Sequence, residues 1–192
     1  MRGKAILIAG IVLLLVLPLL TAAPGETAPR TRVAYWLMAD VIRGEADAAG
    51  AVGVQTNVFR QGEEVMFRAR VLDIATGQDP GGQGQGLKAL QELGLKVTAY
   101  LEDGLSFPMT YGRHPARAQG REAVSWFWTA SWKIPATYNA PNDAAGLRIP
   151  VTGARYVKWW VIVTDKSGAS VRFDPIGGGT TLPPIGLIIG KR

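Results

Sequence analysis

The chain has 192 residues, a formal net charge of +6, 47% hydrophobic residues, no cysteine and one histidine. This length is enough for one domain with a packed core, and the hydrophobic content excludes a chain that is disordered throughout. The lack of cysteine excludes disulfide bonds, cysteine-ligated zinc and thiol nucleophiles. The single histidine excludes a metal site built from several histidines.

The first 23 residues carry two positive charges, Arg2 and Lys4, followed by an almost unbroken apolar run over residues 5–20. A basic start before an apolar stretch is typical of a secretory signal peptide. Residues 5–23 are also enough to cross the hydrocarbon core of a membrane, about 30 Å thick, as a helix. We therefore expect residues 1–23 to be either an uncleaved signal anchor or a cleaved signal peptide. The apolar side chains expected to contact lipid include Ile6, Leu7, Ile11, Leu14 and Leu17.

Both interpretations place the rest of the chain outside the cytoplasm, because the positive charges hold the N-terminus inside. The chain is then anchored to the cytoplasmic membrane, or secreted if the segment is cleaved. When Arg2 and Lys4 are subtracted, the net charge falls from +6 to +4. A charge of that size is ordinary for an exported domain, so we do not expect a nucleic-acid partner.

Residues 24–32 form a linker that contains proline and threonine, and short segments of period-two alternation follow it. The alternation predicts strands over residues 65–72, 97–101, 126–134 and 157–163, with shorter ones at 171–173 and 187–189. Asp103-Gly104 indicates a hairpin turn. A short helix is expected over residues 87–93, ended by Gly94, whereas residues 35–42 are compatible with either a strand or a helix. We therefore predict an all-β fold for residues 33–192, an antiparallel sandwich.

Three segments resemble the immunoglobulin-like and fibronectin type III-like modules of bacterial envelope proteins. Residues 57–73 contain the pattern Phe-x-x-Gly-Glu-x-Val before a core strand that ends at an Asp-bearing turn. Residues 128–135 resemble a later strand that leaves the sheet at a proline, and residues 156–168 resemble the penultimate strand and its turn. The resemblance covers residues 54–189 and implies an Ig-like sandwich, but such modules serve many functions.

A strand followed by an aspartate and a glycine occurs twice, at Asp73 and at Asp165. In one interpretation each carboxylate accepts hydrogen bonds from the backbone of its own turn. In the other, Asp73, Asp165 and Asp174 converge at one end of the sandwich and bind Ca²⁺, which prefers several oxygen ligands. No other cofactor is expected.

Aromatic and basic residues provide the candidate partner-binding groups. Trp126, Trp128, Trp132 and Trp159 are expected in the core, so that Trp36, Phe127 and Trp160 point outward, where they could contact a protein or stack on a sugar. A basic loop is expected around Tyr111, as a solvated loop or as a patch for an acidic partner, a phosphate or anionic lipid. Its charged members are Arg113, His114, Arg117 and Arg121.

No catalytic constellation is evident in the sequence, and we expect no enzyme activity. The pairs Glu63-Glu64 and Glu102-Asp103 are expected to be solvated turn charges, and no serine has the context of a nucleophile elbow. The favoured function is a non-catalytic, membrane-anchored docking subunit of an envelope complex. The alternatives are a glycan-binding or adhesion module, and a metal-dependent protein or enzyme centred on His114 or on the Asp73/Asp165 end.

Overall fold

The computed structural model describes residues 34–45, 53–81, 86–118, 121–144, 153–175 and 186–191. All of them belong to one compact unit, Thr31–Arg192. The expected anchor or signal at residues 1–23 and the linker at 24–32 lie outside these described residues. Within the described part of the chain, no helix is both long and apolar enough to span a membrane.

The first sheet contains four antiparallel strands in the order β1-β3-β7-β6. Its strands are β1 (Tyr35–Arg43), β3 (Glu64–Asp73), β7 (Arg121–Lys133) and β6 (Thr110–Ala118). The predicted alternation of β3 is confirmed, because Val65, Phe67, Ala69 and Val71 are all buried. The ambiguous segment 35–42 is a strand, since it pairs with β3 along its whole length.

The second sheet has the order β11-β10-β4-β5. It comprises β11 (Ser170–Phe173), β10 (Trp159–Thr164), β4 (Lys96–Leu101) and β5 (Ser106–Pro108). The predicted turn joins β4 to β5, and Gly104 adopts a φ of 95°, which favours glycine. The strand predicted over residues 157–163 is interrupted at Lys158, whose N–H donates to the Glu102 carboxylate instead of to a ladder.

A third, smaller sheet has the order β2-β12-β9-β8. It contains β2 (Val58–Arg60), β12 (Leu187–Gly190), β9 (Arg155–Val157) and β8 (Asn142–Asp143). The pairing of β12 with β2 is parallel, so the expectation of a wholly antiparallel fold is wrong at this point. Residues far apart in sequence form this pair, and strand alternation carries no information about such partners.

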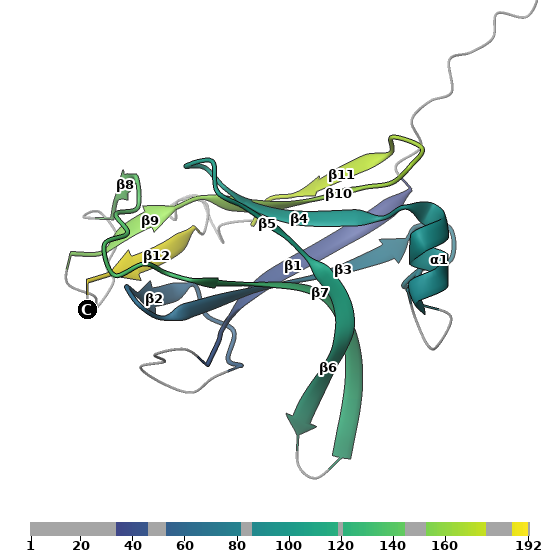
Figure 1. Ribbon diagram of the computed structural model, residues 1–192, viewed down its shortest axis with the longest axis horizontal. Helices are drawn as coiled ribbons and strands as arrows, with labels where there is room; N and C mark the ends of the chain where they lie inside the picture. The colour runs from purple at the N-terminus through teal and green to yellow at the C-terminus, as the bar shows by residue number, and fades with distance from the viewer. Residues whose placement is uncertain are drawn as a thin grey trace, which may run out of the picture. The chain divides into compact units, whose positions relative to one another are not determined.

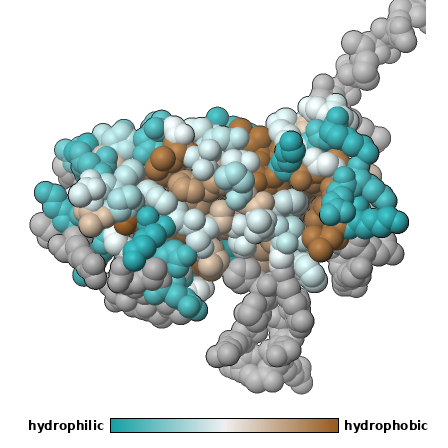
Figure 2. Space-filling view, viewed as in Figure 1, coloured by the Kyte–Doolittle hydropathy of each residue, from teal (hydrophilic) through white to brown (hydrophobic). Residues whose placement is uncertain are grey.

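The first two sheets face each other across one hydrophobic core, as Figure 1 shows. Phe67 of β3 lies 5.3 Å from the ring of Phe107 in β5 and 5.7 Å from the ring of Trp159 in β10. Trp128, Trp132 and Trp159 are buried, as predicted. Trp126 is only half-buried and stacks on Tyr111. In Figure 2 apolar surface runs across the middle of the view, where the two sheets face each other in Figure 1.

The one helix among the described residues, α1 (Gly86–Leu93), confirms the prediction for residues 87–93. Leu90 is buried in the core whereas Leu87 is exposed, so the helix is amphipathic. The helix ends at Gly94, whose φ of 61° is the left-handed conformation of a glycine that ends a helix.

The basic segment around Tyr111 is a β-hairpin rather than the expected loop. β6 and β7 pair from Thr110↔Thr129 to Ala118↔Arg121. β3 pairs with β7 only as far as Trp128, so the distal part of the hairpin is a two-stranded ribbon. Figure 1 shows this ribbon leaving the two sheets.

Candidate functional site

The outer face of the first sheet carries the largest exposed aromatic side chain among the described residues. Trp36 of β1 is 59% exposed and lies opposite Leu72 of β3 in the strand register. Ile74, just after β3, is 54% exposed. These three residues line a shared hollow with Val171, so apolar surface continues around this end of the sheet. Contiguous exposed apolar surface is a common feature of interaction sites.

An ion pair occupies the middle of the same outer face. The Nε–H of Arg68 in β3 donates to Asp40 Oδ1 in β1 at 2.8 Å, and a second guanidinium N–H donates to the other carboxylate oxygen. Both side chains are about three-quarters buried. The hydrogen bonds from Arg68 to Asp40 raise the pKa of Arg68 above its ordinary value, so this guanidinium stays charged and held.

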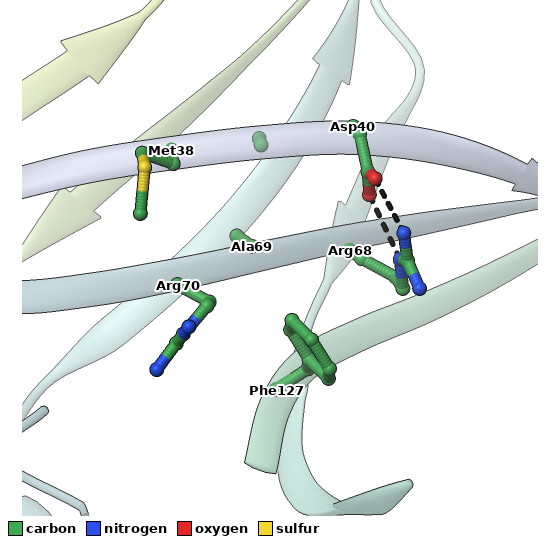
Figure 3. A pocket seen from close by; sticks show the side chains of 7 residues that line it. Met38, Asp40, Arg68, Ala69, Arg70 and Phe127 are labelled. Carbon is green, nitrogen blue, oxygen red and sulfur yellow. Dashed lines mark hydrogen bonds and ion pairs between the residues drawn. The ribbon is translucent and has the colours of Figure 1, made fainter. Parts of the chain in front are cut away.

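A second arginine lies beside the first, on the same aromatic ring. The Arg68 guanidinium carbon is 5.1 Å from the centroid of the Phe127 ring, and that of Arg70 is 5.9 Å from it. Figure 3 shows that the Arg70 side chain points away from Asp40 and from Met38. A hollow of about 140 Å³ opens here, bounded by these side chains with Ala39 and Ala69. Among the described residues no carboxylate forms an ion pair with Arg70, whereas Arg68 has one.

The three aromatics expected to point outward do not form one surface. Trp36 and Phe127 lie on the outer face of the first sheet, whereas Trp160 lies on the outer face of the second. Tyr100 stacks on one face of the Trp160 ring at 6.0 Å, and the Arg172 guanidinium lies 4.4 Å from its centroid. With these two neighbours Trp160 is half-buried, so it offers little open ring surface to a sugar.

The expected basic patch is placed only in part by the structure. Arg113, His114 and Arg117 lie in β6, and Arg121 begins β7. In the register Arg113 is opposite Trp126, and His114 is opposite Ser125. The side chains of residues 113–118 and 121–125 lie outside the described residues, so the patch and a His114 site remain predictions.

The three aspartates expected to bind Ca²⁺ do not converge. The Asp73 carboxylate accepts from two backbone N–H groups of its own turn, at 2.7 and 3.1 Å. Asp165 accepts from Ser167 N–H at 2.8 Å and from Tyr35 Oη–H at 2.8 Å, and Asp174 pairs with Arg172. Within the described part of the chain, no three His, Asp or Glu side chains are grouped closely enough to hold a metal ion. The turn-capping interpretation describes this geometry.

Asp73 and Asp165 nevertheless lie at the same end of the two facing sheets. Burial, followed by the hydrogen bond to Asp165 and the charges of Asp165 and Asp73, raises the pKa of Tyr35 to about 12. Hydrogen bonds from Ser167, Tyr35 and the turn backbone lower the pKa of Asp165, although its partial burial opposes them. The Tyr35–Asp165 contact therefore ties β1 to the turn after β10.

Glu63 corrects the expectation that residues 63 and 64 are solvated turn charges. It is only 2% exposed, and its carboxylate accepts from Arg60 N–H at 2.8 Å. The Arg43 Nε lies 3.7 Å from the other carboxylate oxygen. Glu63 thus joins the turn between β2 and β3 to the end of β1.

Met38, Asp40, Arg68 and Arg70 are not recognisable as site residues from the sequence alone. Period-two alternation places Arg68 and Arg70 on the polar side of the strand predicted over residues 65–72. It does not place Met38 and Asp40, because residues 35–42 are compatible with a strand or a helix, and it cannot say which residues face each other across two strands.

Comparison with known proteins leaves the family of the chain open. No protein-family model matches it, and no curated protein matches it by sequence. Among solved structures, a DUF4426 family protein from Pseudomonas aeruginosa matches with a TM-score of 0.32 and 12% identity, over 73% of this chain and 83% of that chain.

Proposed function

We propose that this chain is a non-catalytic docking module, held outside the cytoplasm by its N-terminal apolar segment, that binds a protein subunit of the cell envelope through the outer face of β1, β3 and β7. In this proposal the two facing sheets form an immunoglobulin-like sandwich of the bacterial envelope type. The observation that carries it is the exposed Trp36 with its apolar neighbours Leu72 and Ile74.

A protein partner fits this surface for physical reasons. Interface cores are enriched in tryptophan, methionine and arginine, and the outer face presents Trp36, Met38 and Arg70 together. When a partner covers a large aromatic side chain that is more than half exposed, apolar area is removed from water. This burial lowers the free energy of the complex and so favours binding.

The export of the module is supported by the sequence alone. Arg2 and Lys4 before the apolar residues 5–20 give the pattern of a signal or anchor. An anchor would keep the module at the membrane and so raise its effective concentration near membrane proteins.

The experiment is gentle detergent extraction of the tagged full chain from its own membranes, followed by a native gel and mass spectrometry. We expect subunits that co-migrate with the wild type and with Leu105→Ala, a control residue that is 40% exposed in the β4–β5 turn. Trp36→Ala should lose them. The proposal is wrong if the wild type migrates alone, or if Trp36→Ala retains the same subunits as the control.

A further inference from the structure

We propose that the hollow beside Arg70 binds a carboxylate group carried by an apolar segment of a protein partner. This inference rests on the docking function proposed above and specifies the chemistry that the outer face recognises.

The register of β1 and β3 places two arginines in equivalent positions with different neighbours. Arg68 lies opposite Asp40, and the next outward pair places Arg70 opposite Met38. Both guanidinium groups lie over the ring of Phe127, within 6 Å of its centroid. The two sites therefore share their aromatic support and differ in the residue that faces the arginine, as Figure 3 shows.

Arg68 has a carboxylate partner within the chain, whereas Arg70 has none among the described residues. Arg68 holds Asp40 with two hydrogen bonds, one to each carboxylate oxygen. A planar guanidinium matches a carboxylate in this paired geometry. At Arg70 the residue opposite in the register is Met38, which has no carboxylate, and a hollow opens beside the two side chains. A carboxylate from outside the chain would complete the second site as Asp40 completes the first.

The charge of the outer face favours a group with a single negative charge. Asp40 compensates Arg68, and Glu64 lies opposite Lys133 in the strand register. Among the described residues, no carboxylate forms an ion pair with Arg70. A phosphate group carries a charge of about −1.5 to −2 at neutral pH and would be only partly compensated here, whereas a carboxylate carries one charge.

The walls of the hollow indicate what carries that carboxylate. Met38 and the Phe127 ring border it, and Trp36 lies two residues before Met38 on the same face of β1. These are apolar surfaces that a flexible hydrophilic chain would not cover favourably. A glutamate or aspartate flanked by aliphatic side chains matches both the cation and its surroundings.

The test is titration of the isotope-labelled full chain in detergent micelles, observed by NMR at the Arg70 Nε–H and at the Phe127 backbone amide. The probes are an N-acetylated, C-amidated Leu-Glu-Leu tripeptide, the corresponding Leu-Gln-Leu tripeptide, and methyl phosphate. We expect saturable shifts with the glutamate peptide and at least about tenfold weaker binding of the other two. Equal or tighter binding of the glutamine peptide or of methyl phosphate would overturn the inference.

Two variants test the site independently. Arg70→Gln removes the cation, and Met38→Asp supplies a carboxylate from the chain itself, in the position that Asp40 holds beside Arg68. Both should weaken binding of the glutamate peptide by at least about tenfold. The control Lys133→Gln, which removes a cation elsewhere on the outer face, should bind like the wild type. Wild-type binding by Met38→Asp or by Arg70→Gln contradicts the inference.

The outcomes also separate this site from the docking function. If Trp36→Ala removes the membrane subunits but the glutamate peptide does not bind, the carboxylate site is wrong and the docking function stands. If the peptide binds as expected but the chain migrates alone, the site stands and the docking function is wrong.

Discussion

Replacing the buried Glu63 by glutamine should destabilise the fold by breaking an ion pair while preserving shape. The glutamine oxygen can still accept from Arg60 N–H, the bond that measures 2.8 Å. Its amide group would then face the Arg43 Nε, which lies 3.7 Å from Glu63 Oε1, so two donors would oppose each other. Arg43 Nε is buried and makes no hydrogen bond in the described structure. The negative charge of the Glu63 carboxylate, in the ion pair, therefore compensates the positive charge of Arg43.

The size of the effect follows from the burial of the pair. Removing one member of a buried ion pair costs about 3–5 kcal/mol. Arg43 is 19% exposed and also donates to the Val58 carbonyl, so we expect the lower end, about 3 kcal/mol. With a urea dependence of about 2 kcal/mol per molar, the unfolding midpoint falls by about 1.5 M.

The assay is urea unfolding of the full chain in mild detergent, followed by tryptophan fluorescence. Adding Arg43→Met to the Glu63→Gln variant removes the uncompensated guanidinium and should restore at least about 1 kcal/mol. The reasoning is refuted if Glu63→Gln costs less than about 1 kcal/mol, or if the double variant is less stable than the single one.

Three further predictions concern the core, an acid-sensitive contact and the outer face. Phe67→Ala should cost about 3–5 kcal/mol in the same urea assay, because the side chain is fully buried between the sheets, and Phe67→Leu should cost clearly less. The pKa of Asp165 is lower in the folded chain than its ordinary value of 3.8. The carboxylate therefore stabilises the fold at pH values above 3.8, and this stabilisation is lost as the pH falls from 3.8 through the folded-state pKa. Asp165→Asn should therefore be less stable than the wild type at neutral pH, with a difference that shrinks in acid; a constant difference would contradict this. Trp36→Ala should change the free energy of unfolding by no more than about 0.5 kcal/mol, since the side chain is mostly exposed. A larger loss would mean that Trp36 supports the fold rather than an interface.

Alternation along single strands was enough to predict much of the fold. The apolar rows at Val65–Val71 and Val97–Leu101 are buried because successive side chains on a strand point to opposite faces. The same rule placed Trp128, Trp132 and Trp159 in the core and Trp36 outside it. Turn residues such as Gly104 marked strand ends correctly, because their backbone preferences are local.

Pairing between distant segments was not predictable in this way. The parallel pair of β2 with β12, the extended hairpin of β6 and β7, and the burial of Glu63 each depend on a partner elsewhere in the chain. A charged pair such as Glu63-Glu64 looks like a solvated turn until Arg43 is brought beside it.

The sequence by itself determined the composition, with no cysteine and one histidine, and the buried faces of several strands. The export signal that it predicts in residues 1–23 remains a prediction. The sequence also placed Arg68 and Arg70 on the same polar side of one strand, since they are two residues apart. Only the tertiary structure decided that Arg68 faces Asp40 while Arg70 faces Met38 and a hollow. The reason is that strand register is set between strands, so two identical residues on one face acquire different roles from the neighbour that each one meets.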